Sequence, residues 1–226
     1  MKINNRLKKI GDLVDTNSLI LDIGCDHALL DIYLVKKRNF KKVIASDILK
    51  GPLESAKANI KREKVEKNIE LRLGDGLSVY TNDIDTVVLS GMGGRTIIGM
   101  FKYNLNLIKN IETIILSPNN YQSDVRKFFI SIGYKIVDEY LIEEKNIVYT
   151  IIKLKKGKQR LNKKQLLFGP ILLEKQDQIF TNYYIKELKS REILLSVLPK
   201  NYRLKRLIIN KEIKLIKNEL NKKSLD

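Results

Sequence analysis

Residues 20–30 read ILDIGCDHALL, an apolar segment that ends in an Asp-x-Gly turn and continues directly into a second apolar segment. A β-strand that stops at such a turn and leads into a helix opens a β-α-β unit, which forms a small-molecule pocket at the carboxyl end of its sheet. The pattern therefore predicts an α/β fold with its chemistry beside Asp22 and Gly24.

The glycine spacing in this turn argues against a dinucleotide. Dinucleotide-binding folds use a G-x-G-x-x-G turn, in which the glycines let a pyrophosphate approach a helix N-terminus. Here Gly24 stands alone and is followed by Cys25 and Asp26, and the charge of Asp26 would repel a pyrophosphate. A cationic ligand fits better, and S-adenosylmethionine, which carries a sulfonium and an ammonium group, suits Asp22 and Asp26 on charge.

Acidic residues recur at the ends of later predicted strands. Asp47 lies within the apolar run 43–48, at the position where folds of this kind present a carboxylate to ribose hydroxyls. Residues 69–73 alternate as a strand, and Asp75 in the turn that follows is placed to accept a hydrogen bond from an adenine amino group.

A fourth apolar strand, residues 84–89, leads into SGMGG, whose three glycines let the backbone approach a ligand closely. At each single position a helix cap or a plain turn is the competing explanation, so the prediction depends on four strand ends converging on one pocket. The predicted cofactor-binding residues are Asp22, Gly24, Cys25, Asp47, Ile48, Asp75, Gly76, Gly91 and Met92.

Four segments, taken in order, resemble a known bacterial family. They are LDIGCDHA (21–28), SGMGG (90–94), LSPN (116–119) and FGP (168–170), and they are similar to motifs of the TrmK family, tRNA (adenine22-N1)-methyltransferases that use S-adenosylmethionine. Cys25 stands where the family pattern often has Ser, a change that conserves size. The resemblance spans nearly the whole chain and implies a class I (Rossmann-like) methyltransferase that modifies N1 of adenine 22 in the D-arm region of tRNA.

The order of the remaining segments predicts the rest of the sheet. Residues 112–116 read as a fifth strand, 123–132 as a helix, and 134–142 with 147–154 as a closing hairpin, which completes a seven-stranded doubly wound sheet. We expect a methyltransferase domain over residues 1–155 and a basic helical, tRNA-binding domain over residues 156–226.

The second predicted domain has helical spacing. Leu173, Phe180, Tyr184 and Leu188 fall on one face, and Ile209, Ile213, Ile216 and Leu220 fall on another. The pattern is interrupted between these two sets, at Pro199 and Asn201. Two long antiparallel helices in a coiled-coil-like hairpin are therefore expected.

Basic residues are concentrated in the last third of the chain. The net charge is +17, and residues 1–152 hold 23 Lys and Arg against 19 Asp and Glu, whereas residues 153–226 hold 20 against 7. Such asymmetry is typical of a polyanion partner, here tRNA, bound by neutralising phosphates. A Lys-rich, AT-biased genome is the competing explanation, but it would raise the basic excess in the first two thirds of the chain as well.

Four residues near the hairpin turn are predicted to contact the RNA backbone without reading bases: Lys200, Arg203, Lys205 and Arg206. A Lys-rich helix face is more often simply solvated, and an apolar stripe at helical spacing is more often core. Dimerisation through the stripe competes with RNA binding, although a monomer is favoured over a dimer.

The chemistry expected of such an enzyme needs little acid-base assistance. N1 of adenine carries an in-plane lone pair and no proton, so alignment for in-line transfer and exclusion of water supply most of the acceleration. The product ring is cationic, and an adjacent carboxylate would stabilise it. The segment SGMGG replaces the Asn/Asp-Pro-Pro-aromatic motif of amino-group methyltransferases, which argues against N6 methylation.

The candidate catalytic residues are Asp26, His27 and Asn119. Asp26 is the electrostatic candidate, and Asn119 is expected to meet the target base. His27 would touch substrate or cofactor, although a structural hydrogen bond is the commoner role for a lone histidine. Tyr121 would stack on the base or, in the preferred interpretation, pack on the sheet.

The composition predicts the cellular compartment, and two alternative functions are compatible with the sequence. The sequence has no run of about 18 apolar residues, no signal-peptide core and a single cysteine, so a cytoplasmic protein without membrane contact or a metal site is expected. The main alternative function is a small-molecule methyltransferase whose basic hairpin serves oligomerisation. A second alternative is a non-enzymatic RNA-binding module that retains a cofactor pocket.

Overall fold

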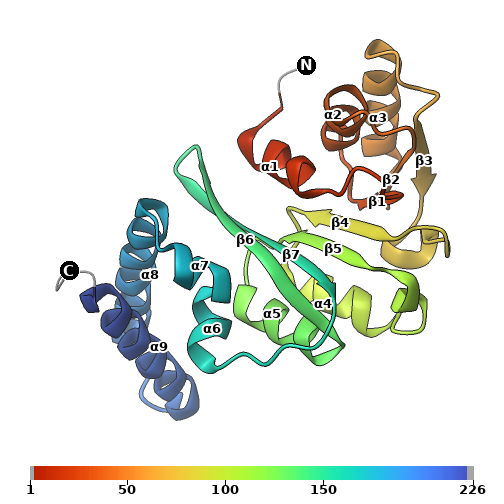
Figure 1. Cartoon of the computed structure of the whole chain (residues 1–226). Helices are drawn as coiled ribbons and strands as arrows, with labels where there is room; N and C mark the ends of the chain where they lie inside the picture. Colours follow the sequence, from red (N-terminus) through yellow and green to blue (C-terminus); the bar gives the residue numbers. More distant parts are fainter. Residues whose placement is uncertain (1–2, 223–226) are drawn as a thin grey trace. The chain divides into compact units, whose positions relative to one another are not determined.

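The computed structural model describes residues 3–222, and the chain divides into two compact units, Met1–Arg160 and Leu161–Asp226 (Figure 1). The first unit carries a seven-stranded sheet, and the second is helical in its described part.

The sheet of the first unit has the strand order β3-β2-β1-β4-β5-β7-β6. Its strands are β1 (Ile20–Ile23), β2 (Val43–Asp47), β3 (Ile69–Leu73), β4 (Thr86–Ser90), β5 (Thr113–Ser117), β6 (Tyr134–Glu144) and β7 (Ile147–Lys156). The first five strands pair in parallel, and β7 runs antiparallel to both β5 and β6. The order reverses between β1 and β4, which opens a crevice at their carboxyl ends. The predicted seven-stranded doubly wound sheet is confirmed.

Helices cover both faces of this sheet, with α1, α2 and α3 on one side and α4 and α5 on the other (Figure 1). Their bounds are α1 (Asn5–Leu13), α2 (Leu29–Arg38), α3 (Lys50–Arg62), α4 (Gly94–Lys102) and α5 (Gln122–Ser131), with short 3-10 turns η1 (Gly76–Val79) and η2 (Leu107–Asn110). Ile10 of α1 and Leu34 of α2 pack in one buried cluster with Val88 and Ile115 of the central strands. This packing fixes the strand ends that carry the candidate site.

A buried ion pair joins α5 to the antiparallel edge of the sheet. The Arg126 Nε donates to Glu139 Oε1 at 2.7 Å, and the two side chains are 1% and 0% exposed. Both charges are removed from water, and their pairing offsets part of the cost of burying them.

The second unit holds two short helices followed by two long ones. They are α6 (Lys163–Phe168), α7 (Pro170–Lys175), α8 (Gln178–Val197) and α9 (Arg203–Lys222). The two long helices pack against each other as a hairpin. Phe168, Phe180 and Tyr184 form an aromatic cluster, with ring centroids 4.6 Å apart for both Phe168–Tyr184 and Phe180–Tyr184.

One detail of the predicted helices is wrong. The helical spacing places Leu173 on the same helix face as Phe180, but Leu173 lies in α7, one helix earlier. The chain breaks at Gln176, which adopts a left-handed conformation (φ 36°), and the Asp177 carboxylate then accepts a hydrogen bond from the Phe180 N–H at 2.8 Å. This N-cap starts a new helix and ends the apolar periodicity of the preceding one.

Candidate active site

The turn between β1 and α2 is held in an unusual backbone conformation. Gly24, Asp26 and Ala28 all have positive φ, at 78°, 51° and 55°. Non-glycine residues in this region carry strain that persists only where the surrounding structure enforces it, and such residues cluster at functional sites. The Gly24 and Cys25 N–H groups donate to the Ser46 carbonyl at 2.8 and 2.9 Å, which ties the turn to β2.

A cavity of about 330 Å³ opens at this turn, at the carboxyl ends of β1 and β4. Its volume falls within the range of small-molecule sites. Of the predicted residues it gathers Asp22, Gly24, Cys25, Asp26, His27, Gly91 and Met92, together with Arg6, Leu7, Leu29, Leu30 and Ser90. Two segments far apart in the sequence, the β1–α2 turn and the loop after β4, therefore line one cavity.

The other predicted cofactor residues lie at the neighbouring strand ends, outside the lining of this cavity. Asp47 is the last residue of β2, where its Oδ1 accepts a hydrogen bond from the Leu49 N–H at 3.0 Å. Ile48 is 59% exposed, and Asp75 is also exposed. The Gly74 N–H donates to the Asp47 carbonyl at 3.1 Å, so the ends of β2 and β3 are adjacent. Gly76, at the start of η1, is buried.

Arg6 lines the cavity but was not among the predicted site residues. It belongs to α1, and its guanidinium lies over the Tyr149 ring at 4.3 Å from the centroid. A β-carbon added at Gly91 would lie 3.8 Å from Arg6 Nη1. No local motif marks this arginine, because its place in the site depends on how α1 packs on the sheet.

Asp31 was also missed, and it forms a buried carboxyl pair with Asp22. The two carboxyl groups lie within hydrogen-bonding reach of each other, and Asp31 and Asp22 are 0% and 4% exposed. Burial, opposed in part by the hydrogen bond to Asp31 and aided by the charge of Asp47, raises the pKa of Asp22 to about 7. Burial and the adjacent Asp22 charge raise the pKa of Asp31 well above its ordinary value. A sequence signal did exist, since Asp31 is a charged residue inside the apolar run LLDIYLV.

The candidate catalytic residues Asp26 and His27 lie at the cavity and remain open to solvent. Their side chains are 69% and 51% exposed, and His27 Nε2 lies 3.5 Å from Asp26 Oδ1. Burial raises the pKa of the neighbouring Cys25 thiol, so the thiol stays protonated at neutral pH.

Asn119 holds the loop after β4 in place. Its Nδ2 donates to the Gly91 carbonyl at 2.6 Å, and its N–H donates to the Met92 carbonyl at 2.9 Å. The next residue, Asn120, accepts a hydrogen bond from the Gly94 N–H at 3.0 Å. The loops after β4 and β5 are therefore pinned together, and the Asn119 amide nitrogen is already engaged.

Tyr121 does not pack on the sheet as the preferred interpretation expects. It is 42% exposed and has a left-handed backbone (φ 55°). The Arg95 guanidinium lies over its ring, 4.3 Å from the centroid. A cation–π contact at the surface thus takes the place of packing on the sheet.

We predict that Gly94→Ala disrupts this loop pair. A β-carbon at Gly94 would lie 2.4 Å from the Asn120 carbonyl oxygen and 3.0 Å from Val125 Cγ2, so the loop after β5 must move. We expect kcat for methyl transfer to fall at least about tenfold, because a displacement on the order of 1 Å disturbs alignment of the reacting groups.

Gly99→Ala is the matched control, because it lies in the same helix and a β-carbon there meets nothing within 4 Å. Alanine there should be neutral or slightly stabilising. Steady-state kinetics of both variants, corrected for the folded fraction, check the prediction. Equal kcat values would show that the tight approach at Gly94 is dispensable.

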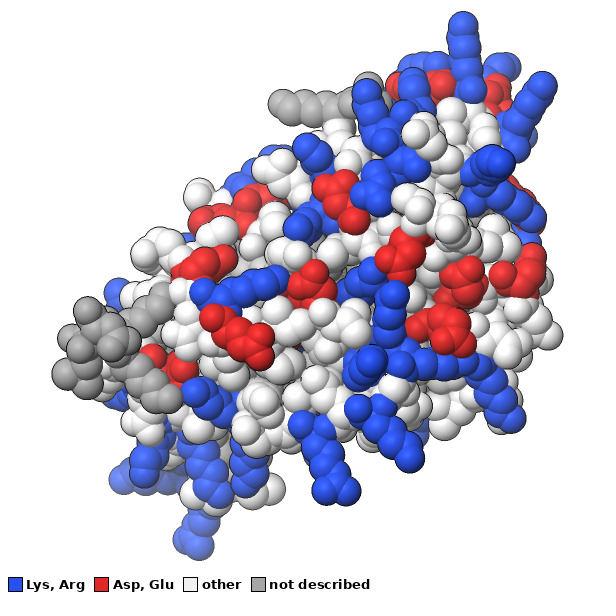
Figure 2. Space-filling view, in the orientation of Figure 1, with Lys and Arg blue, Asp and Glu red and all other residues white. Residues whose placement is uncertain are grey.

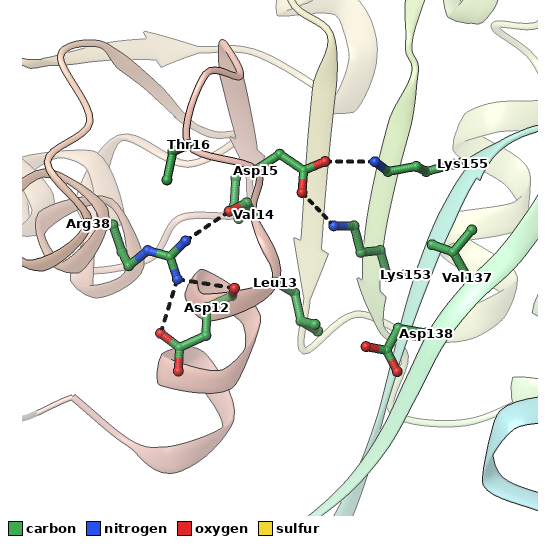
Figure 3. A pocket seen from close by; sticks show the side chains of 10 residues that line it. All are labelled: Asp12, Leu13, Val14, Asp15, Thr16, Arg38, Val137, Asp138, Lys153 and Lys155. Atoms are coloured by element: carbon green, nitrogen blue, oxygen red, sulfur yellow. Dashed lines mark hydrogen bonds and ion pairs between the residues drawn. The ribbon is translucent and has the colours of Figure 1, made fainter. Parts of the chain in front are cut away.

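A larger groove, of about 660 Å³, lies at the opposite end of the strands (Figure 3). Its charges are already paired: Asp15 bridges Lys153 and Lys155 at 2.8 and 2.9 Å, and Arg38 lies 3.5 Å from Asp12. Lys155 pairs in register with Thr113, the first residue of β5, which places the groove at the amino ends of the parallel strands. Cofactor sites in doubly wound sheets lie at the other end.

Three of the four predicted RNA-binding residues, Lys200, Arg203 and Lys205, are exposed where α8 leads into α9. Figure 2 shows Lys and Arg side chains projecting from the region of this hairpin, at the lower left of the view. Arg206 differs, because its Nη1 donates to the carbonyls of Leu195 and Leu198 at 2.8 and 2.5 Å. It therefore caps the C-terminus of α8.

Residues 3–222 contain neither a cluster of metal ligands nor a helix that could span a membrane. In this part of the chain no group of three or more His, Cys, Asp or Glu side chains could hold a metal ion. None of its helices is both long and apolar enough to cross a membrane.

Sequence comparison with known proteins identifies relatives over most of the chain. A family model described as TrmK, tRNA (adenine(22)-N(1))-methyltransferase, matches residues 20–218. The tRNA (adenine(22)-N(1))-methyltransferase of Bacillus subtilis is 27% identical over 196 residues, which cover 84% of this chain and 82% of that protein. The resemblance inferred from the four motifs is confirmed.

Solved structures agree with this assignment. Sp1610 of Streptococcus pneumoniae, in complex with S-adenosyl-L-methionine, has a TM-score of 0.89 at 30% identity, and the match covers 97% of this chain and 100% of that one. TrmK of M. capricolum, in complex with S-adenosyl-homocysteine, has a TM-score of 0.83 at 28% identity, with 98% and 99% covered. The chain therefore belongs to the TrmK family of tRNA (adenine(22)-N(1))-methyltransferases.

Proposed function

We propose that this protein transfers the methyl group of S-adenosylmethionine to N1 of adenine 22 in the D-arm region of tRNA. The observation that carries the proposal is the cavity at the carboxyl ends of β1 and β4, in a chain of this family. Two of the similar solved structures hold S-adenosyl-L-methionine or S-adenosyl-homocysteine.

The residues at the site fit this cofactor by charge and by shape. Asp22 and Asp26 offer carboxylates to its ammonium and sulfonium groups, and Arg6 offers a partner for its carboxylate. Gly24 has a φ of 78°, and a β-carbon there would lie 2.6 Å from Met92 Cε, so a larger residue would crowd the cavity lining.

The neighbouring strand ends would hold the nucleoside part of the cofactor. Asp47 would accept hydrogen bonds from the ribose hydroxyls, Asp75 would accept one from the adenine amino group, and the exposed Ile48 side chain would pack on the adenine ring. When bound, the cofactor supplies an electrophilic methyl group on sulfur.

The protein's own part in the reaction is positional and electrostatic. Adenine N1 is a competent nucleophile without deprotonation, so Asp26 and His27 need not act as bases. Asp26 stabilises the positive charge that appears on the ring. Asn119, whose Nδ2 already donates to Gly91, can offer its Oδ1 to the adenine amino group and so orient the base. A paired adenine must first be extruded, because N1 takes part in Watson–Crick pairing.

Incubation with labelled S-adenosylmethionine and unmodified bacterial tRNA tests the proposed activity. Nucleoside mass spectrometry after digestion should reveal 1-methyladenosine. Cofactor binding without any transfer to RNA would instead favour a small-molecule substrate.

We infer that the helical unit binds the tRNA backbone through Lys200, Arg203 and Lys205. Residues 161–226 hold 15 Lys and Arg against 7 Asp and Glu. Replacing the three residues with alanine should weaken tRNA binding at least about tenfold. The slope of log affinity against log salt should fall by about 3, roughly one unit for each phosphate that is no longer neutralised.

Filter binding at several salt concentrations measures both quantities, and calorimetry should show an unchanged affinity for S-adenosylmethionine. The control replaces three exposed lysines of the first unit, Lys57, Lys61 and Lys67, with alanine. A similar loss in the control would mean that only net charge matters. A small-molecule enzyme would lose no activity in either variant or at high salt.

A monomeric, cytoplasmic enzyme completes the proposal, since unmodified tRNA is a cytoplasmic substrate. Val197 and Leu204 are 70% and 72% exposed, so a dimer that buries apolar surface of the helical unit is the state to test against. Light scattering at increasing protein concentration tests the monomeric state, and a constant dimer mass would contradict it.

A further inference from the structure

The buried carboxyl pair of Asp22 and Asp31 has no role in the chemistry described above. Asp22 lines the cofactor cavity, whereas Asp31 lies in the first turn of α2 and is 0% exposed. A backbone N–H at Asp31 favours its charged form, but among the described residues no side-chain donor reaches either of its buried carboxylate oxygens. Buried carboxylates normally receive donors or a cation, so the pair requires an explanation.

The groups around the pair are mostly acidic or neutral. Asp47 of β2 adds negative charge next to Asp22, and the Cys25 thiol lies in the turn beside both carboxyl groups. The exposed Asp26 and His27 line the same cavity from the turn. Ser90 at the end of β4 and Arg6 of α1 also line the cavity. The Arg6 guanidinium lies over the Tyr149 ring.

Two contacting carboxyl groups in such surroundings cannot both be ionised. Like charges in a site with little water force one carboxyl group to retain a proton, as in other buried carboxyl pairs. The raised pKa values of Asp22 and Asp31 agree with this argument from geometry.

We infer that Asp22 and Asp31 share one proton in the free protein and release it to solvent when S-adenosylmethionine binds. The inference rests on the proposed cofactor site. The O–H bond of the protonated carboxyl group breaks, its electron pair stays on oxygen, and the buffer takes the proton. The additional negative charge on the pair is then balanced by the sulfonium and ammonium groups of the cofactor.

This exchange gives Asp31 the role of a positioning residue. It touches Asp22 and is not among the residues that line the cavity. S-adenosylhomocysteine lacks the sulfonium charge, so it should release fewer protons than S-adenosylmethionine. The pair thus favours the charged substrate form of the cofactor over the product as pH rises.

Calorimetry of the full-length protein tests the inference. S-adenosylmethionine is titrated at pH 6.5 in phosphate and in imidazole buffer, whose different ionisation heats count the released protons. We expect a release approaching one proton, which vanishes above about pH 8.5, and an affinity that falls about tenfold per pH unit below the pKa of the pair. Binding of the wild-type protein without release would overturn the inference, whereas absence of binding would overturn the proposed function.

Asp31→Asn provides the sharper comparison. An asparagine amide donates to Asp22 and keeps it ionised, so proton release should disappear and the affinity should become nearly independent of pH. Asp83→Asn, which changes an exposed acid near the other end of β4, is the matched control and should retain full release.

Thermal unfolding supplies a second readout that does not need the cofactor. Because folding raises the pKa of the pair, the folded protein binds more protons than the unfolded chain between about pH 4 and 7, and stability falls as pH rises through this range. Asp31→Asn should remove this fall and have a higher Tm than the wild type at pH 8. A parallel pH dependence of Tm in the two proteins would contradict the shared proton.

Discussion

Replacement of Asp47 with alanine is expected to weaken S-adenosylmethionine binding by about 100-fold. The carboxylate would accept two hydrogen bonds from the ribose, and hydrogen bonds to a charged group contribute about 1.5–3 kcal/mol each. Asp47 is half-buried at the end of β2, where its carboxylate accepts a local hydrogen bond from the Leu49 N–H at 3.0 Å. The loss should therefore fall on binding and leave the fold intact.

Calorimetric titration of the cofactor measures the effect, and thermal melting confirms that the variant is folded. The affinity for tRNA should change little, because the proposed RNA contacts belong to α9 and the turn before it. Asp83→Ala removes an exposed carboxylate near the opposite end of the sheet and should bind the cofactor normally. Full cofactor affinity in Asp47→Ala would rule out the ribose assignment.

Loss of the buried charge at Glu139 is expected to destabilise the protein more than any surface change. Glu139→Gln removes the carboxylate charge that pairs with the Arg126 guanidinium, in a site where both side chains are at most 1% exposed. Breaking a buried pair in this way costs about 3–5 kcal/mol, a large part of the roughly 5–15 kcal/mol that stabilises a typical domain. Urea denaturation should show a lower midpoint with an unchanged slope.

The matched control is Glu112→Gln, which breaks the Lys156–Glu112 pair on the surface of the same unit. The two side chains of that pair are 36% and 62% exposed, so its loss should cost at most about 1 kcal/mol. The double variant Arg126→Met with Glu139→Leu should recover most of the stability, because neither charge of this pair remains buried. A cost below about 1 kcal/mol for Glu139→Gln would show that water reaches the pair.

The sheet was predictable because its strands are short apolar runs closed by turn residues. Asp22, Asp47 and Asp75 each lie at or just after the end of a strand, and parallel strands bring their carboxyl ends to one edge. The antiparallel closure by β6 and β7 was predictable from two apolar runs joined by a short turn. Local pattern was sufficient in these places because the periodicity and the tertiary structure agree.

The roles of several site and capping residues depend on tertiary contacts and could not be predicted from the sequence. Arg6 enters the cavity only because α1 packs on the sheet, and Asp31 meets Asp22 only because α2 folds back over β1. Arg206 looks like any other basic residue of a solvated helix face, yet it caps α8 through Leu195 and Leu198. Such roles depend on contacts with residues distant in the sequence, or on the conformation of a turn, and the apolar periodicity of the sequence predicts neither.

Methylation of N1 at a single adenine can be detected by reverse transcription. A methyl group on N1 blocks Watson–Crick pairing, so a primer extended on tRNA treated with the enzyme and S-adenosylmethionine should stop next to position 22. The stop should be absent without the cofactor and in a tRNA whose adenine 22 is replaced by guanine. A stop at another position, or methyl transfer that persists in the guanine variant, would contradict methylation at N1 of adenine 22.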